Sequence, residues 1–314
     1  MSEAACVYVS SRGLMKSCDV YPPTPSSSTR VCYDYAWATL TPGAIVYVNS
    51  SAIPDFLRKA WPLIQVPIVL VSGDCDETVP VDVIPNKDTF RAFMEDSRLI
   101  AWYAQNAFPI HPKIRQIPIG LDYHTLSVNE RHPWGPKQTP AQQEQILQIL
   151  SKRVPQSQRE VTAHANFQFS MNTRFAADRR EAYRDLPSDV VDFEEAATTR
   201  FVTWANQAKH LFVASPQGGG VDCHRTWEAL CLGCFPIVKT SFLDPLFEGL
   251  PVLIISEWKN VTPDLLESFA KTWTGKEVGP KITLTYWLDR IRAAVRHHMV
   301  STSARPATLP VSTE

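Results

Sequence analysis

Short apolar runs alternate with segments of helical periodicity along the first part of the chain. Apolar runs of strand length that alternate with helices indicate a mainly parallel sheet with helices on its faces, which is an α/β fold. The strands predicted in this part are residues 6–10, 44–48, 68–72, 99–103 and 114–119. The predicted helices are residues 54–63 and 88–95.

A group of residues that break helices and strands separates this part from a second one. Residues 131–138 contain the sequence HPWGP. Thr139 then has the position of a helix cap, and Pro140 occupies the first position of that helix, which we expect to run to about residue 152. We interpret the region as the linker between an N-terminal domain of residues 1–135 and a C-terminal domain of residues 136–300.

The second part repeats the alternation of strands and helices. Its predicted strands are residues 161–167, 210–215, 235–238 and 251–255. Its further predicted helices are residues 174–184, 194–208, 263–273 and 285–299. Residues 301–314 are polar, and we expect a disordered tail there.

The sequence HLFVASPQGGGVDCHRTWEALCLGCFPIVKT, between residues 210 and 240, predicts a strand, a glycine-rich loop, a short helix and a second strand. Pro216 ends the first strand, Gly218, Gly219 and Gly220 form the loop, and Asp222 has the position of a cap for the helix. Such a loop leaves backbone N–H groups free, and the helix dipole also favours an anion. The unit therefore predicts a phosphate site.

The short helix separates its residues by face. The apolar positions follow helical spacing and predict a buried stripe of Trp227, Leu230, Cys231 and Cys234. His224, Arg225 and Glu228 fall on a neighbouring arc, one turn apart. Two interpretations remain open: a site for a phosphorylated ligand, and a capped helix with an ion pair on its surface.

The stretch SPQGGGVDCHRTWEALCLGCFPIV resembles the nucleotide-sugar motif of exostosin-like (family 47-type) glycosyltransferases, especially the short soluble members of large algal and protist viruses. Residues 68–80, 102–124 and 166–180 also resemble that group. The resemblance implies the GT-B type of α/β fold, with two Rossmann-like domains and a cleft between them. It further implies that Glu228 binds the ribose hydroxyls and that Arg225 faces the diphosphate, roles that suit a carboxylate and a guanidinium.

The resemblance also extends the predicted donor site beyond the short helix. Arg174 and Arg179 are expected to neutralise the leaving nucleoside diphosphate, although a solvated basic helix face explains them equally well. The full set of predicted donor-binding residues is Arg174, Arg179, Ser215, Pro216, Gly218, Gly219, Gly220, Asp222, His224, Arg225 and Glu228.

The resemblance implies an enzyme that moves a sugar from a nucleotide-sugar donor to a hydroxyl of an oligosaccharide or glycoprotein glycan. The donor is expected to be UDP-linked, with UDP-xylose as one candidate. Transfer is expected to invert the anomeric carbon and to require no cofactor and no metal beyond this co-substrate.

The acidic residues after the strand at 68–72 are candidates for a general base on the acceptor side. Asp76 is the first candidate and Asp74 the second. His124 and Asp122 are reserve candidates for the same role. Asp74 and Asp76 also form a D-x-D pattern, which in a different class of transferases holds a divalent metal on the donor diphosphate. A metal-dependent glycosyltransferase, a nucleotide- or glycan-binding protein without turnover, and an ordinary turn at this point remain alternatives.

Composition excludes several other classes. The 314 residues are 44% hydrophobic and carry a formal net charge of −1, which gives no electrostatic basis for binding nucleic acid. No apolar run reaches the ~20 residues of a membrane span, and no signal peptide is recognisable. Seven cysteines in apolar surroundings predict buried thiols in a reducing compartment. We therefore expect a soluble cytoplasmic protein, in the host cytoplasm if the protein is viral. The glycine loop lacks the GxGxxG spacing of a dehydrogenase.

Overall fold

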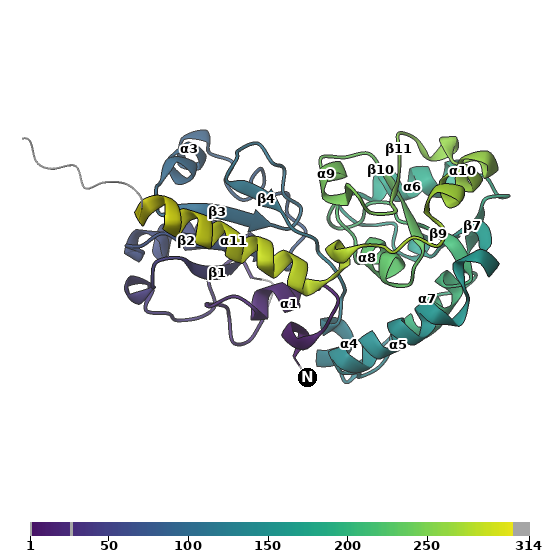
Figure 1. The fold of residues 1–314 in the computed structure, drawn as a ribbon, viewed down its shortest axis with the longest axis horizontal. Coiled ribbons are helices and arrows are strands. Elements are labelled where there is room, and N and C mark those ends of the chain that lie inside the picture. The colour runs from purple at the N-terminus through teal and green to yellow at the C-terminus, as the bar shows by residue number, and fades with distance from the viewer. Residues whose placement is uncertain (1, 26–27, 304–314) are drawn as a thin grey trace, which may run out of the picture.

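The computed structural model describes residues 2–25 and 28–303, and it contains two parallel sheets that are each flanked by helices (Figure 1). The first sheet has the order β1-β2-β3-β4 and the second the order β11-β10-β9-β7-β8. Every pair of neighbouring strands in both sheets is parallel. The α/β fold with two Rossmann-like domains is thus confirmed.

The first sheet is covered on both faces, which explains why its central strands are apolar throughout. β1 and β2 are buried along their whole length. Helices α2 and α3 pack on one face, while α1 and α11 pack on the other. The strands are β1 (Ala44–Asn49), β2 (Ile68–Gly73), β3 (Leu99–Ala104) and β4 (Ile114–Gln116). The helices are α1 (Ser11–Lys16), α2 (Ile53–Lys59), α3 (Lys87–Glu95) and α11 (Leu284–Ser303).

The second sheet has the same construction. Helices α7 and α8 share one hydrophobic cluster with it, and α6 and α10 share another on the opposite face. The strands are β7 (Glu160–Ala165), β8 (Val191–Phe193), β9 (His210–Ala214), β10 (Phe235–Lys239) and β11 (Leu253–Ile255). The helices are α6 (Ala176–Asp185), α7 (Arg200–Gln207), α8 (His224–Cys231), α9 (Asp244–Phe247) and α10 (Pro263–Trp273).

The predicted linker forms a small antiparallel hairpin followed by a helix. The hairpin pairs β5 (Arg131–His132) with β6 (Gly135–Pro136), and α4 (His124–Val128) precedes it. Helix α5 (Pro140–Arg153) begins as predicted, because the Thr139 side chain and Gln142 form a reciprocal capping box. Short 3-10 helices lie at Glu3–Ala5, Trp37–Thr39, Ser50–Ala52, Trp61–Leu63, Gln156–Gln158, Phe167–Phe169, Trp258–Asn260 and Pro280–Ile282.

The last helix corrects the predicted division of the chain into domains. α11 was expected within the C-terminal domain of residues 136–300, but it crosses back and packs against β2, β3 and α1 (Figure 1). Its apolar side chains Leu284, Trp287 and Ile291 are buried in the cluster that also contains Tyr47 and Tyr103 of the first sheet. Helix α11 continues to residue 303, so the expected disorder does not begin at 301. The remainder of that predicted tail lies outside the described residues.

Two local predictions near the ends of elements were wrong. Residues 6–10 make only isolated bridges, and the chain then enters α1, whose cap is Ser10. The helix expected from residue 194 starts at Arg200, because residues 194–199 form the turn after the unpredicted strand β8.

None of the helices within the described ranges is both long and apolar enough to cross a bilayer.

All seven cysteines are free thiols, and most of them lie where the sequence predicts. Cys231 is buried at the end of α8 and Cys234 is buried just before β10, so the C-x-x-C spacing is a packing feature. Cys75 and Cys223 are only partly buried, and Cys32 is exposed.

Candidate functional site

The two domains face each other across a cavity of about 550 Å³. Its wall from the first domain includes Asp76, after β2, and Ile119, after β4. Its wall from the second includes Asn166, after β7, and Gly219 and Gly220, after β9. Ligands of parallel α/β sheets bind at these carboxyl ends of the strands. The cavity is the cleft between two Rossmann-like domains that defines the GT-B type.

A second cavity, of about 360 Å³, adjoins the first on the side of the N-terminal domain. The two cavities have Asp76, Ile119 and His224 in common, so these residues lie where two bound molecules would meet. The other residues that line the second cavity are Ser11, Ser51, Asp74, Cys75, Glu77 and His124. The predicted donor residues and the predicted acceptor residues therefore line neighbouring cavities.

The three glycines of the loop lie close against the ends of polar side chains. A Cβ on Gly218 would lie 2.2 Å from Arg179 Nη2, and one on Gly219 would lie 2.2 Å from Asp76 Oδ2. A Cβ on Gly220 would lie 2.7 Å from Asn106 Nδ2. Contacts shorter than 3.0 Å force a neighbour to move. The loop therefore touches the first domain through Asp76 and Asn106.

The loop keeps only part of the predicted set of free amides. The N–H of Gly218 donates to the carbonyl oxygen of Gly220, at 3.0 Å. The N–H groups of Gly219 and Gly220 have no partner among the residues that the structure describes. Both glycines line the cavity, so their two amides remain as candidate donors to a ligand. Ser215 and Pro216 are buried behind the loop, where Ser215 Oγ lies 2.9 Å from Thr226 Oγ1.

Asp222 does not cap the helix as predicted. The cap position belongs to Cys223, which has no capping side chain. The Asp222 carboxylate instead accepts hydrogen bonds from the Ile119 N–H at 2.7 Å and from Trp227 Nε1 at 2.8 Å, and burial raises its pKa to about 6. Asp222 was mistaken for a cap because its partner Ile119 lies in the other domain.

His224 also connects the two domains. Its Nδ1 lies 2.7 Å from the carbonyl oxygen of Gly120. A carbonyl only accepts hydrogen bonds, so Nδ1 carries the proton and Nε2 is left as an acceptor in the neutral ring. His224 thus presents one basic nitrogen where the cavities meet.

Arg225 and Glu228 lie together on the cleft side of α8, as predicted. Arg225 Nε donates to Asn166 Oδ1 at 2.9 Å, while its buried Nη1 has no hydrogen-bond partner within the described residues. Burial lowers the pKa of Arg225 below its ordinary value. Glu228 lines the same cavity, and its Oε1 lies 4.0 Å from Arg200 Nε. The site thus has an incompletely paired cation one helical turn from a carboxylate.

The two further arginines of the predicted donor set differ in position. Arg179 lines the cleft, and its guanidinium donates to the carbonyl oxygens of Ser170, at 2.7 Å, and Gln217, at 3.1 Å. Arg174 lines neither cavity, because it precedes the start of α6 and pairs with Asp82 at 2.7 Å. The structure therefore brings Arg179, but not Arg174, to the cleft.

The candidate bases lie around the second cavity. Burial raises the pKa of Asp76 above its ordinary value, and its carboxylate lies against Gly219. Asp74 has a left-handed backbone with φ 57°, and its carboxylate lies 3.6 Å from Arg12 Nε. Burial lowers the pKa of His124, whose Nδ1 lies 3.0 Å from Asp122. Asp76 is the only one of these three that also lines the donor-side cavity.

The predicted D-x-D residues do not belong to a recognisable metal cluster. Within residues 2–25 and 28–303, no group of three histidine, cysteine, aspartate or glutamate side chains has the arrangement of a metal site.

Arg200 is a further cleft residue that was not predicted from the sequence; it begins α7 and lines the cleft. Its guanidinium lies 3.2 Å from Asp122 Oδ2 and 4.5 Å from the ring centre of Trp134. Burial alone would raise the pKa of Asp122, but the charges of His224, His124 and Arg200 lower it well below its ordinary value. No local pattern marks Arg200, because its partners are distant in the chain.

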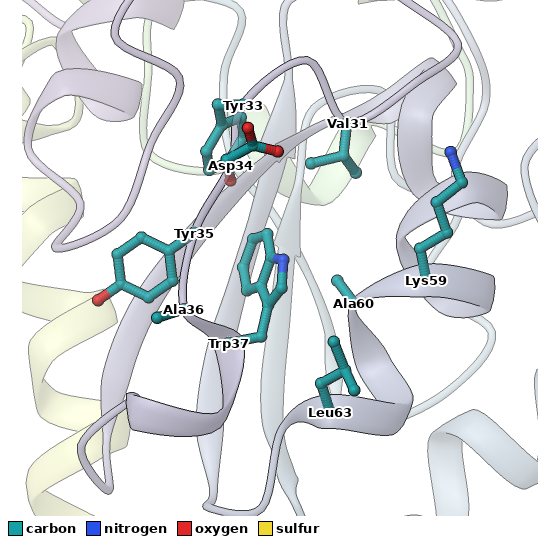
Figure 2. A pocket seen from close by; sticks show the side chains of 9 residues that line it. All are labelled: Val31, Tyr33, Asp34, Tyr35, Ala36, Trp37, Lys59, Ala60 and Leu63. Carbon is teal, nitrogen blue, oxygen red and sulfur yellow. The ribbon is translucent and has the colours of Figure 1, made fainter.

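Another cavity, of about 480 Å³, lies in the first domain between the segment before β1 and the end of α2 (Figure 2). Its lining residues are Val31, Tyr33, Asp34, Tyr35, Ala36, Trp37, Lys59, Ala60 and Leu63. It contains none of the predicted site residues, so it is not the site that the sequence describes.

Comparison with protein-family models and with curated protein sequences gives no match. Among solved structures, the chain is similar to an α,α-trehalose-phosphate synthase (UDP-forming) from Burkholderia vietnamiensis, with TM-score 0.43 and 12% identity over 85% of this chain and 75% of that one. It is also similar to Alr3699/HepE of Anabaena in complex with UDP, with TM-score 0.38 and 10% identity over 83% and 79% of the two chains. At such low identity and TM-score, individual residues of this chain are not equated with residues of those proteins. The interpretation of the site therefore depends on its own geometry.

Proposed function

We propose that the protein is a glycosyltransferase that uses a nucleotide sugar as its donor. The nucleoside diphosphate occupies the larger cavity, against the glycine loop and α8, and the acceptor hydroxyl enters through the smaller one. The donor is UDP-linked, with UDP-xylose as a candidate sugar, and the acceptor belongs to an oligosaccharide or glycoprotein glycan. The resemblance to exostosin-like enzymes supports this assignment.

The observation that carries the proposal is the incomplete hydrogen bonding of the Arg225 guanidinium. A guanidinium that lines a cavity, with a buried Nη1 that lacks a partner, is costly unless an anion completes it. Two free amides of the glycine loop open on the same cavity. Together they provide charge-assisted and backbone donors of the kind that bind a diphosphate. Glu228, one turn further along α8, is placed for the ribose hydroxyls.

The reaction that we propose is a direct displacement with inversion. Asp76 accepts the proton of the acceptor hydroxyl, since it lies where the two cavities meet and burial makes it a stronger base than an ordinary aspartate. The hydroxyl oxygen then attacks the anomeric carbon, and the bond to the diphosphate breaks. Arg225, Arg179 and the loop amides stabilise the departing charge without a metal.

Titration calorimetry with UDP tests the donor site. Replacing Glu228 by alanine removes at least one hydrogen bond from ribose to a charged group, which contributes ~1.5–3 kcal/mol, so UDP should bind about 10- to 150-fold more weakly or worse. The matched control is Glu130→Ala, a carboxylate whose side chain is 79% exposed and lines neither cavity. Unchanged UDP affinity in a folded Glu228→Ala protein would refute the assignment.

A protein that binds nucleotide sugars without turnover is the remaining alternative, and it predicts the same affinities. Release of UDP from UDP-sugars in the presence of glycan acceptors separates the two. Full activity in EDTA is expected, whereas loss of activity that added divalent cations restore would favour the metal-dependent D-x-D mechanism.

A further inference from the structure

The acceptor-side cavity has an excess of negative groups. Three carboxylates line it, those of Asp74, Asp76 and Glu77. Asp74 lies 3.6 Å from Arg12 Nε, whereas Asp76 and Glu77 form no ion pair with any of the described residues. Glu77 is held by the hydroxyl of Ser51, which donates to Oε1 at 2.5 Å. That hydroxyl carries no charge, so the carboxylate of Glu77 is not neutralised by it.

The other cationic side chains near this cavity already have partners. His224 lines the cavity with its Nδ1 2.7 Å from the carbonyl oxygen of Gly120, and Arg179 donates to the carbonyl oxygens of Ser170 and Gln217. Burial lowers the pKa of His124, so its ring is neutral near pH 7. Arg174 approaches the main-chain oxygen of Asp76 at 3.4 Å, but its charge is paired with Asp82 at 2.7 Å. A molecule in this cavity therefore faces a negative surface.

Two polar atoms of the cavity wall also lack partners. Ser11 is 1% exposed and lines the cavity, yet its Oγ has no hydrogen-bond partner among the described residues. The same holds for Oε2 of Glu77. A buried hydroxyl and a buried carboxylate oxygen without partners point to a ligand that supplies hydroxyl or ammonium donors.

The size of the cavity limits the ligand further. A volume of about 360 Å³ is near the lower end of ligand sites, which span ~300–1,000 Å³. No phenylalanine, tyrosine or tryptophan of the described residues lines it, so it lacks the broad apolar rings on which successive sugars of a long glycan would stack. The cavity suits one terminal sugar ring.

We infer that the acceptor site selects by charge: it takes a single neutral or amino sugar ring and rejects sugars that carry a phosphate or a carboxylate. This inference rests on the proposed function, since it assigns the larger cavity to the donor. A phosphate or carboxylate in the smaller cavity would be brought beside Glu77 and Asp76, two carboxylates that form no ion pair with any of the described residues. Neutral hydroxyls and ammonium groups instead donate to these oxygens.

Acceptor series that differ only in charge test the inference. For glucose, galactose and mannose, the probes are the methyl glycoside, its 2-amino counterpart, its 6-phosphate and its uronate. Binding of each in the presence of UDP is measured by saturation-transfer NMR. We expect the neutral and amino sugars of at least one series to bind, with the phosphate and uronate about tenfold weaker or more, the effect of a unit charge a few ångströms away in a partly solvated site.

Glu77→Gln keeps the hydrogen-bonding shape of the side chain and removes its charge. It should reduce the preference for neutral over anionic sugars about tenfold and leave UDP affinity unchanged, since Glu77 does not line the larger cavity. Asp88→Asn is the matched control, because its side chain is 87% exposed and lines neither cavity. Its preference should equal that of the wild type.

The outcomes separate this inference from the proposed function. Anionic sugars that bind as tightly as neutral ones, an unchanged preference in folded Glu77→Gln, or no binding by any sugar of the panel would overturn the inference while UDP affinity stays intact. Failure of UDP to bind the wild type would instead refute the donor site itself.

Discussion

Arg225 offers a prediction in which stability and ligand affinity change in opposite directions. Its Nε donates to Asn166 at 2.9 Å, while its Nη1 is buried without a partner among the described residues. Replacement by methionine retains an unbranched apolar side chain and removes the charge. Replacement of buried charged groups by well-packed apolar ones is often neutral or stabilises a protein by ~1–4 kcal/mol, and losing the hydrogen bond to Asn166 costs ~1 kcal/mol. The free energy of unfolding of Arg225→Met should therefore equal or exceed that of the wild type.

The same substitution should weaken UDP binding strongly. Removing one partner of a buried charge pair costs ~2–5 kcal/mol, which corresponds to about 30- to several-thousand-fold in the dissociation constant. Because Arg225 is proposed to face the diphosphate, UMP should lose less affinity than UDP. Calorimetry with both nucleotides and urea unfolding of the apo protein measure these changes.

Arg180→Met is the matched control for this experiment. Arg180 lies on α6, its Nη1 donates to the carbonyl oxygen of Met171 at 3.1 Å, and it lines neither cavity. Its substitution should leave UDP affinity unchanged. A marked loss of stability in Arg225→Met together with wild-type UDP affinity would show that Arg225 is a structural residue, and the argument for the phosphate site would fail.

Three further substitutions test separate parts of the structure. Asp76→Asn should keep its UDP affinity and lose at least ~100-fold in sugar transfer, and normal turnover would remove Asp76 from the role of base. Gly219→Ala brings a Cβ within 2.2 Å of Asp76 Oδ2, so transfer should fall through displacement of Asp76; unaltered transfer rates would contradict this coupling. Burial lowers the pKa of His164 to about 3, so only the unfolded chain takes up this proton as the pH falls below ~6.5. The free energy of unfolding should then decrease by up to ~1.4 kcal/mol per pH unit between pH 6.5 and pH 3, and His164→Leu should show a smaller slope in urea unfolding at pH 7 and pH 5.

The sequence was most informative where structure and chemistry lie within one short segment. The strand, glycine loop and helix between residues 210 and 240 are fixed by local spacing, so Arg225 and Glu228 were predicted on one face of the helix and lie there. The linker helix was equally predictable, because its capping box involves only Thr139 and Gln142. In both cases the interacting residues are at most one or two helical turns apart.

Predictions failed where the partner comes from a distant part of the chain. The periodicity of α11 reveals an apolar stripe but not which sheet receives it, so its packing on the first domain could not be read from the pattern. Asp222 looks like a cap until Ile119, over one hundred residues earlier in the chain, is placed beside it. Arg200 has its partner Asp122 in the other half of the chain. Each case depends on how the two domains pack.

These long-range contacts also explain how the cleft is organised before any ligand binds. Asn106 accepts a hydrogen bond from the Asp222 N–H at 2.8 Å, and Asp222 in turn accepts from the Ile119 N–H. His224 adds a hydrogen bond to the carbonyl oxygen of Gly120. These bonds tie the segment after the glycine loop to the strand ends of the first domain, so the position of Asp76 against Gly219 is set by the protein itself. A base held in place by this packing does not pay for its ordering when the substrates bind, which is the physical advantage of a preorganised site.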